Sequence, residues 1–558
     1  MLSLMSVDET TPDTSPANRT TTARRAPAKT APAKKATGTR STTARKAPAK
    51  KATTRRATAA AAPKIVDGTQ LNAKVEEFEI DTADLSGSSV THLTVAERKR
   101  LGKLARVNTP RKDLATWAPG DDRPDATGLL LGQETSRVQA LLPVRHARMA
   151  TSAFAFYRGA AIVMASDLST TPRTNLEVQL CGDAHLSNFG MFGAPDRSVV
   201  FDVNDFDETN PGPFEWDVKR LATSFVLAAR DNKLPADVAR KAAMMAATSY
   251  RESMAELALK TDLDIWYERV DPSSVVAALA ALPASATNKS KKSGAKRKKV
   301  EELAQAAVQK RVAKARARDA WSAIEKITEV VDGQRRFRNQ PPLLARLDAN
   351  AETYALVNHL FHTYRATLEE DRQVLLRRYE IIDFGHKVVG VGSVGLLAFV
   401  LLMRGRDDND LMVLQVKQAQ SSVLEPYTRK SVYTKHGHRV VAGQRLMQTA
   451  SDSFLGWIQG PGGRHFYVRQ LRDMKWSPDP SVLNADKIVR YAMLCGHTLA
   501  RAHARAGDSV AISAYLGGGS SFDKAITEFA IAYADQTERD FAEFTAAIAD
   551  GRIEAHEE

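Results

Sequence analysis

Residues 181–190 read CGDAHLSNFG, and residues 199–209 read VVFDVNDFDET. Short apolar or β-branched runs alternate in this region with loops that are rich in Gly, Asp and Asn. Such alternation predicts short strands around a polar site. Several carboxylates gather in these two short loops, which makes the region the first candidate for the chemistry of the chain.

The spacing of Asp183 and Asn188 points to one chemistry. They are five residues apart, as are the Asp and Asn of the kinase catalytic-loop motif H-R-D-x-x-x-x-N. That chemistry needs a carboxylate that accepts a hydroxyl proton and oxygen ligands that hold Mg²⁺. Asn188 and Asp205 are the candidate metal ligands, and Asp207 is a further candidate. The alternative is a turn-rich loop whose carboxylates cap backbone N–H groups.

A second motif, VVGVGSVGLL over residues 388–397, predicts a glycine turn between two strands. The candidate phosphate-binding residues of this turn are Gly390, Gly392, Ser393 and Gly395. A polar turn and another apolar run follow, which favours strand–turn–strand over the strand–turn–helix of a Rossmann fingerprint. That last run ends in Lys417. A glycine flap with a lysine on the third strand binds nucleotide in kinases; the alternative is an exposed strand lysine.

Asp383, Phe384 and Gly385 spell the D-F-G motif, but they precede the glycine turn. A magnesium-binding D-F-G follows the catalytic loop in kinases. We therefore interpret this D-F-G as a coincidence.

Length and composition restrict the class of protein. The 558 residues, 43% of them hydrophobic, suffice for a sizeable core and for roughly two to four folded units. Two cysteines, Cys181 and Cys495, exclude a disulfide framework and indicate a reducing compartment. The first residues lack the pattern of a signal peptide, and the apolar run over residues 394–403 is too short to span a bilayer. We expect a cytoplasmic protein without a membrane partner.

The formal net charge of +14 is concentrated in two segments. Residues 1–64 carry 14 Lys and Arg against three acidic residues, and residues 288–299 add seven positive charges, so the rest has a net charge of −4. The first segment is a loose repeat of Ala, Lys, Arg, Thr and Pro, which predicts a disordered tail. It indicates either nonspecific nucleic-acid binding, with a nucleoid location, or a solubilising tail.

The remaining pattern predicts an α+β fold with antiparallel strands and a mostly helical remainder. A β-rich region spans about residues 379–416, and we expect a helix over residues 438–457 and a strand over residues 465–471 after it. Helical spacing also covers residues 300–331 and the chain from Ala485 onward. The expected segments are a disordered tail (1–64), a catalytic-loop and helical lobe with an exposed basic loop (65–345, loop 282–299), a glycine-loop β lobe (346–480) and C-terminal helices that return to the helical lobe (481–558).

Several blocks over most of residues 90–550 resemble the bacterial family known as domain of unknown function 2252: FAFYRGAA, GDAHLSNFG, NDFDET, GPFEWDVKRLA, VVGVGSVG, GQRLMQ, YVRQLRDMK and LARAHARAGD. More distantly, the motifs resemble the kinase superfamily, above all aminoglycoside and small-molecule phosphotransferases. That resemblance implies a two-lobed kinase-like fold, with a small antiparallel β lobe and a larger helical lobe, and ATP and Mg²⁺ as cofactors. It also implies that Asp217 braces the catalytic loop and that the backbone around Val468–Leu471 meets adenine.

The order of the motifs is unusual. In kinases the glycine loop and lysine precede the catalytic loop, whereas here Gly390 follows Asp205 by 185 residues. Residues 489–508 resemble the helix that leads into the catalytic loop. We therefore expect a circularly permuted kinase-like fold, which neighbouring termini make physically feasible. This arrangement requires a cleft that brings Lys417 close to Asp205.

Two departures weaken the case for catalysis. Cys181 stands where phosphotransferases often have histidine, and the helix after Lys417 presents Gln444 and Gln448 instead of a glutamate partner for the lysine. Glu425 is the alternative partner. A site that binds nucleotide without efficient transfer therefore stays open.

Three further side chains have open assignments. Arg158 and Arg469 could bind phosphate bidentately or form internal ion pairs. His185 could orient the catalytic loop.

The leading hypothesis is an ATP- and Mg²⁺-dependent phosphotransferase whose acceptor the sequence does not identify. Asp183 would be the base and Lys417 the phosphate clamp. The alternatives are a nucleotidyl (AMP) transferase on the same scaffold, a nucleotide-binding pseudoenzyme, or a nucleic-acid-associated binding protein that uses the basic tail.

Overall fold

The computed structural model describes residues 92–270, 320–341, 343–347, 350–388, 394–471 and 477–556, with side chains from residue 324 in the second range. The chain divides into two units, Met1–Ser89 and Val90–Glu558, and every described residue belongs to the second. The predicted tail over residues 1–64 and the predicted basic loop over residues 282–299 lie outside the described residues. So do three residues of the glycine turn, namely Gly390, Gly392 and Ser393.

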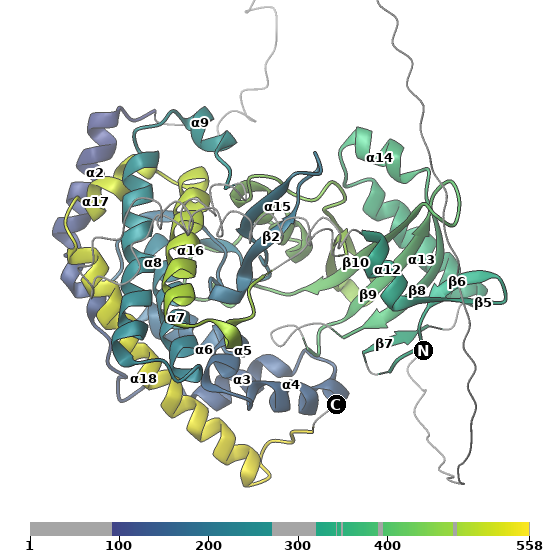
Figure 1. Ribbon diagram of the computed structural model, residues 1–558, viewed down its shortest axis with the longest axis horizontal. Helices are drawn as coiled ribbons and strands as arrows, with labels where there is room; N and C mark the ends of the chain where they lie inside the picture. The colour runs from purple at the N-terminus through teal and green to yellow at the C-terminus, as the bar shows by residue number, and fades with distance from the viewer. Residues whose placement is uncertain are drawn as a thin grey trace, which may run out of the picture. The chain divides into compact units, whose positions relative to one another are not determined.

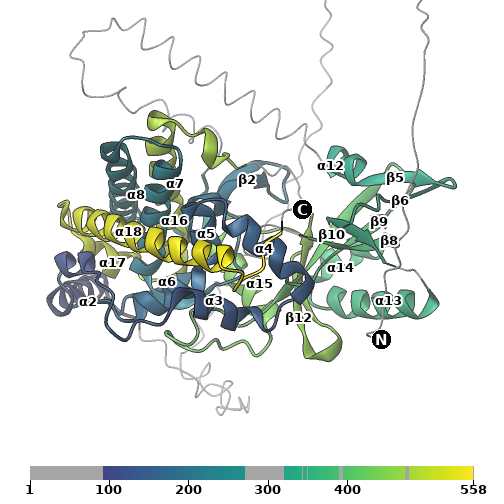
Figure 2. The ribbon, with the colours of Figure 1, turned by 90° about the horizontal axis from the view of Figure 1, so that it is seen from below.

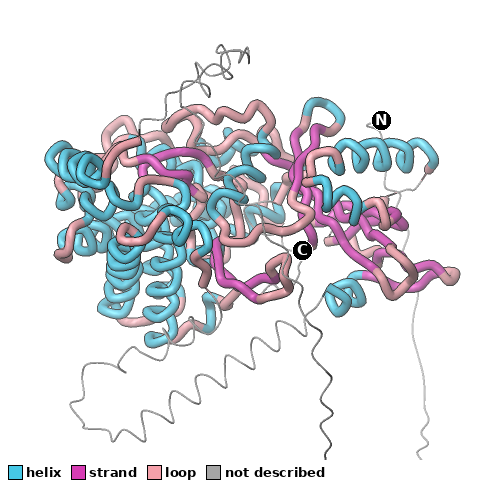
Figure 3. Tube along the Cα trace, turned by 90° about the horizontal axis from the view of Figure 1, so that it is seen from above, coloured by secondary structure: helices cyan, strands magenta, loops and turns pink. Residues whose placement is uncertain are grey.

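The fold is α+β, with helices and small antiparallel sheets, as the sequence predicts. The largest sheet has six strands in the order β11-β12-β10-β9-β8-β7, all antiparallel neighbours (Figures 1 and 3). Its strands are β7 (Leu344–Arg346), β8 (Glu380–Lys387), β9 (Ala398–Arg404), β10 (Leu411–Ala419), β11 (Gly456–Gln459) and β12 (His465–Gln470). All nine residues of β10 are buried; β9 and β12 flank the strand, and α12 (Ala320–Ile327) and α15 (His436–Met447) contact it.

Strands β8, β9 and β10 occupy the positions that the glycine motif predicts, and β10 carries Lys417. In the register of the sheet Lys417 lies opposite Ala398 of β9 and Tyr467 of β12. The helices that accompany this sheet are α12 (Ala320–Ile327), α13 (Ala351–Arg365), α14 (Glu370–Leu376) and α15 (His436–Met447). The hydrophobic core of the sheet contains residues from Phe361 to Val468, including Phe384, Met412 and Leu414.

Two helix predictions extend too far. The helix expected over residues 438–457 ends at Met447, because the backbone of Gln448 is extended and its side chain donates to the Val203 carbonyl. Residues 456–459 instead form β11. Likewise, residues 328–331 of the helix expected over 300–331 form strand β5, which pairs with β6.

The helical part of the structure consists of segments from both ends of the described chain. Its helices are α2 (Val95–Asn108), α3 (Ala126–Glu134), α4 (Leu142–Met149), α5 (Ala153–Gly159), α6 (Ala161–Ser169), α7 (Phe214–Asp231), α8 (Ala236–Leu257), α9 (Asp262–Tyr267), α16 (Ala485–Ala506), α17 (Ser509–Leu516) and α18 (Ser521–Ala549). Helices α7, α8 and α16 pack on one another, and α18 crosses α7 and α8 (Figures 1 and 2). The C-terminal helices therefore complete a core that the earlier helices begin.

Three two-stranded antiparallel sheets supplement the six-stranded sheet. They are β1 (Glu177–Leu180) with β4 (Asn210–Pro213), β2 (Phe189–Gly193) with β3 (Val199–Val203), and β5 (Thr328–Val331) with β6 (Gln334–Phe337). The β2–β3 hairpin lies between β1 and β4 in the chain. The first polar loop (residues 181–188) therefore joins β1 to β2, and the second polar loop (residues 204–209) joins β3 to β4. None of the described helices has the length and apolarity that crossing a bilayer requires.

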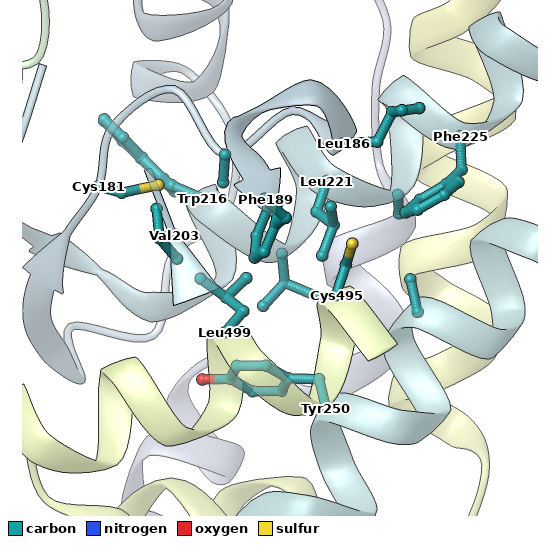
Figure 4. Packing of buried hydrophobic residues seen from close by; sticks show 14 of the residues in the cluster. Cys181, Leu186, Phe189, Val203, Trp216, Leu221, Phe225, Tyr250, Cys495 and Leu499 are labelled. Atoms are coloured by element: carbon teal, nitrogen blue, oxygen red, sulfur yellow. The ribbon is translucent and has the colours of Figure 1, made fainter. Parts of the chain in front are cut away.

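The polar loops rest on the largest hydrophobic core. Figure 4 shows Phe189 and Val203 from the hairpin beside Leu221 of α7 and Leu499 of α16. All four side chains are buried. Close packing against this core holds the backbone that carries the carboxylates. A movement of these loops would therefore disturb the packing of the core.

Candidate functional site

A cavity of about 830 Å³ lies between the polar loops and the six-stranded sheet. From the loops it is lined by Asp183, Asn188, Asp205 and Asp207, and from the sheet by Gln415 and Lys417. The sequence-predicted catalytic and metal-binding residues therefore share one cavity with the predicted lysine. Pockets of roughly 300–1,000 Å³ are the usual size for small-molecule ligands.

Lys417 joins the sheet to the second polar loop. Its ammonium forms an ion pair with Asp207, and it lies 3.8 Å from Asp205 Oδ2. Tyr467, which faces Lys417 across the strands, donates its hydroxyl to Asp207 Oδ1 at 2.8 Å. Burial alone would lower the pKa of Lys417, but the two carboxylates outweigh it and raise that pKa. The ammonium is therefore charged at every physiological pH.

Asp183 pairs with a different cation, Arg220. Arg220 of α7 donates its Nε to Asp183 Oδ1 at 2.6 Å, and His185 Nε2 lies 3.7 Å from Asp183 Oδ2. Burial raises the pKa of Asp183, and Arg220 opposes that rise. Burial also lowers the pKa of His185 well below its ordinary value, so the ring is neutral near pH 7.

Asn188 is bound to the loop through its amide nitrogen. Its Nδ2 donates to the Asp183 carbonyl at 2.7 Å, and the backbone N–H of Asn204 donates to the Asn188 carbonyl at 2.8 Å. The amide oxygen is then the atom of this side chain that suits a cation. These bonds also tie the loop after β1 to the end of β3, which precedes Asp205.

Asp217 holds the backbone of the first polar loop. Its Oδ2 accepts the N–H of Cys181 at 2.8 Å and its Oδ1 accepts the N–H of Gly182 at 3.1 Å. His503 of α16 lies 3.2 Å from the same carboxylate and also bonds Tyr250. Asp217 is almost fully buried and does not line the cavity, so its contacts are with the loop and not with a ligand.

Gly182 permits the turn at which the first polar loop begins. Its φ is +82°, and a Cβ there would overlap the carbonyl of Glu208. The two polar loops therefore touch at this glycine, which fixes the separation between the Asp183 and Asp205 segments.

Arg439 and Glu208 are functional candidates that the sequence did not reveal. Arg439, on α15 and almost fully buried, donates to the carbonyls of Asp207, at 2.8 Å, and of Thr209. Glu208 lines the cavity and accepts the N–H of Val423 at 2.8 Å. Burial raises the pKa of Glu208 to about 7. An arginine in G-H-R-V-V and an acid in D-E-T carry no motif, so only the tertiary contacts identify them.

The end of the glycine turn is bound to the helical part of the chain. Gly395, with a φ of +86°, accepts the N–H of Val138 on its carbonyl at 2.7 Å. Arg137 Nη1 donates to the Val394 carbonyl, also at 2.7 Å. Arg137 itself lines the cavity. The segment between α3 and α4 thus fixes the position of the backbone that leaves the glycine turn and leads into β9.

The candidate partners of Lys417 on or near α15 do not contact it. Gln444 donates to Gln448, and Gln448 donates to the Val203 carbonyl at 2.6 Å. Glu425 accepts the N–H of Ser431 and lies outside the lining of the cavity. Among the described residues, the counter-charges of Lys417 are the carboxylates of the second polar loop.

Two further residues that the sequence analysis discusses, Val468 and Asp383, do not line the cavity. Val468 is in the middle of β12 and its side chain is buried in the sheet core, whereas the neighbouring Arg469, Gln470 and Leu471 line the cavity. Asp383 of the D-F-G sequence is on β8, where it accepts the N–H of Phe337 at 2.7 Å. It has a structural partner and does not line the cavity, as expected for a coincidental motif.

The cavity contains oxygen donors of the kind that could hold a Mg²⁺ ion. In the described ranges, no group of three or more His, Cys, Asp or Glu side chains could hold a metal by itself. Mg²⁺ does not need such a cage, because it is usually held by one or two carboxylates together with waters and substrate phosphates. Asp205 and Asp207, with the Asn188 amide oxygen, form a set of that kind beside the Lys417 ammonium.

Comparison with known proteins gives one match. The family model described as "Uncharacterized protein conserved in bacteria (DUF2252)" matches residues 137–547. These residues include both polar loops, Lys417 and the helices α16 and α17. No curated protein and no solved structure matches the chain.

Proposed function

We propose that this chain, which belongs to the bacterial family DUF2252, is an ATP- and Mg²⁺-dependent phosphotransferase with a kinase-like, two-lobed architecture. The family description names no activity, so the proposal rests on the geometry of the cavity. The observation that carries it is the meeting of Lys417 with Asp205 and Asp207 in the same cavity as Asp183 and Asn188.

The order of the elements supports a circular permutation of that architecture. Strands β8 and β9 flank the glycine turn, and the next strand, β10, carries Lys417. In a kinase, likewise, two strands flank the glycine loop and the third carries the lysine. The carboxylates it meets precede it by more than 200 residues. Helix α16, which follows the sheet in sequence, packs on α7 and α8 beneath the polar loops. The lobe that would bind nucleotide is therefore inserted between two parts of the helical lobe.

Each residue of the site has a role in this proposal. Asp205, Asp207 and the Asn188 amide oxygen would hold Mg²⁺, which neutralises phosphate charge and orients the transferring group when it is bound. Lys417 would bind the phosphates of ATP. Asp183 would accept the proton of the acceptor hydroxyl. Its carboxylate accepts the Arg220 Nε, and this cation opposes the rise in the pKa of Asp183 that burial causes.

Calorimetric titration of the full chain with ATP and Mg²⁺ tests the nucleotide site. We expect wild type to bind, and Asp205→Ala and Lys417→Ala to weaken binding by at least about tenfold. Lys241→Ala, on the exposed surface of α8, is the matched control and should bind as wild type does. Equal binding by all four proteins, or binding by none, would overturn the assignment.

Intact-mass measurement after incubation with ATP separates the possible reactions. A phosphoryl adduct on the protein, or turnover of ATP to ADP that Asp183→Asn abolishes, supports phosphotransfer. An adenylyl adduct would show nucleotidyl transfer on the same metal site. Binding without any turnover would be the behaviour of a nucleotide-binding pseudoenzyme. That alternative has a structural basis, because the described partners of Lys417 are aspartates and not the glutamate that pairs with the lysine in active kinases.

A further inference from the structure

The helical wall of the cavity is basic. Arg148 of α4 and Arg158 of α5 both line the cavity, and Arg158 interacts electrostatically with Asp183. Helices α4 and α5 pack against each other, so the two arginines come from one rigid part of the chain. This wall is separate from the sheet, which supplies Lys417.

The backbone on both sides of Arg158 is fixed by buried arginines. Arg220 Nη2 donates to the Tyr157 carbonyl at 3.0 Å, and Arg145 Nη2 donates to the Gly159 carbonyl at 2.9 Å. The guanidinium of Arg158 itself lies over the Phe154 ring, 5.9 Å from its centre. Arg158 is therefore held in place by its surroundings and projects into the cavity from a fixed point.

Three other arginines at or beside the site have protein acceptors, but Arg158 has none among the described residues. Arg220 pairs with Asp183, Arg137 donates to the Val394 carbonyl, and Arg469 donates to the Asn204 carbonyl at 3.2 Å. Within the described ranges, Arg158 forms no ion pair, and its Nε is buried without a hydrogen-bond partner. Burial lowers the pKa of Arg158, and Asp183 and Asp205 only partly offset that effect.

An unsatisfied guanidinium in a cavity suits a ligand with negative charge. A buried cation without a hydrogen-bonding partner is costly, and a phosphate or carboxylate provides bidentate acceptors for it. The position beside Asp183 is also the position of the acceptor, because Asp183 is the group that would take the acceptor's proton. A polycationic acceptor, such as an aminoglycoside, would instead be repelled by Arg148 and Arg158.

We propose that Arg158 binds a phosphate or carboxylate group of the acceptor, so that the substrate is a small anionic molecule that also carries the reacting hydroxyl. This inference rests on the proposed function. Asp183 takes the hydroxyl proton while the acceptor oxygen forms the new bond to the γ-phosphorus and the bond to ADP breaks. Arg158 does not take part in that exchange; it binds and orients the acceptor.

Titration with inorganic phosphate tests the inference, with the full chain saturated with Mg²⁺ and a non-hydrolysable ATP analogue so that the nucleotide's phosphate positions are filled. We expect wild type to bind phosphate and Arg158→Gln to bind it at least about tenfold more weakly. Arg158→Lys, which keeps the charge, should lose less than Arg158→Gln. Arg406→Gln is the control, because Arg406 is an exposed arginine on the turn between β9 and β10.

The affinity for the ATP analogue separates this inference from the proposed function. All four proteins should bind the analogue within about twofold of one another. If Arg158→Gln weakens the analogue as much as phosphate, Arg158 belongs to the nucleotide site and the inference is wrong. Unchanged phosphate binding in Arg158→Gln, or binding of spermine in preference to phosphate, would also overturn it.

The same titration without nucleotide covers the case in which the analogue does not bind. Failure of the analogue to bind wild type would contradict the proposed function but would leave the anion site measurable. Phosphate binding that Arg158→Gln weakens would then support Arg158 as an anion-binding residue, and unchanged binding would refute it. A parallel titration with acetate shows whether the site takes carboxylates as well as phosphates.

Discussion

The Lys417 ammonium forms an ion pair with the Asp207 carboxylate, although 210 residues separate the two positions in the chain. The pair joins the six-stranded sheet to a loop that is built on the helical core. Because Tyr467 and Asp205 also approach this pair, a single buried cation organises two carboxylates and a phenol. The same contact that assembles the site therefore contributes to the stability of the folded chain.

Lys417→Met should lower the free energy of unfolding by about 2 kcal/mol. Breaking a fully buried ion pair costs more than this, but here water reaches the two carboxylates. The side chains of Asp205 and Asp207 are 34% and 21% exposed, whereas that of Lys417 is 4% exposed. Chemical denaturation measures the change. The double variant Lys417→Met/Asp207→Asn should recover part of the loss, because it removes one of the two carboxylate charges that Lys417→Met leaves without a cation. Additive losses in the double variant would show that the pair contributes no coupling energy.

Gly182→Ala should destabilise the chain by about 3 kcal/mol, since the residue has a positive φ and a Cβ would overlap the Glu208 carbonyl. Gly333→Ala is the matched control. Gly333 also has a positive φ, of +74°, but no atom lies within 4 Å of the point that a Cβ would occupy, so its replacement carries the conformational cost alone. Thermal or chemical denaturation of both variants gives the comparison, and equal losses would contradict the steric contact between the two polar loops.

The sequence predicts those site residues that belong to a recognisable local pattern. Asp183, Asn188 and Asp205 follow from their spacing within loops, and the alternation of apolar and polar runs indicates the strand that bears Lys417. These signals are local, because turn residues and strand periodicity act over a few neighbours. The ends of elements are less predictable: the apolar pattern continues past Met447, but the tertiary bond from Gln448 to the Val203 carbonyl ends α15 there.

Partners from distant segments could not be predicted in this way. No local pattern indicates that Arg220 pairs with Asp183, or that Arg439 donates to the Asp207 and Thr209 carbonyls. For Arg158 the sequence leaves phosphate binding and an internal ion pair as alternatives. In the described part of the chain the guanidinium lines the cavity and its Nε has no hydrogen-bond partner, which no local pattern indicates.

Arg137→Met should loosen the segment that leaves the glycine turn. The Arg137 guanidinium donates to the Val394 carbonyl, and Leu397 donates its N–H to Gln418 Oε1 at 3.1 Å. We expect faster hydrogen exchange of peptides that cover residues 394–397 and about tenfold weaker binding of ATP, because the segment no longer has a fixed position. Arg406→Met, at an exposed turn, is the control. Unchanged exchange in Arg137→Met would show that Val138 alone anchors the segment.

Glu208→Gln should change the dependence of stability on pH. Burial raises the pKa of Glu208 from an ordinary value of 4.5 to about 7, so the folded chain binds this proton more tightly than the unfolded chain does. The contribution of Glu208 to stability is therefore complete below about pH 4.5 and is lost as the pH rises through about 7. The side chain is only partly buried, and we expect the loss to be about 1–3 kcal/mol.

Denaturation of wild type and Glu208→Gln between pH 4.5 and pH 8 measures this effect, since glutamine imitates the protonated acid and does not titrate. The stability of wild type relative to the variant should fall across this range and level off above the folded pKa of about 7. Asp196→Asn, which replaces an exposed carboxylate in the turn between β2 and β3, should not alter the slope between pH 5 and pH 8. A constant difference between wild type and Glu208→Gln would mean that Glu208 has the same pKa in the folded and unfolded chain, and that its contact with the Val423 N–H compensates fully for burial.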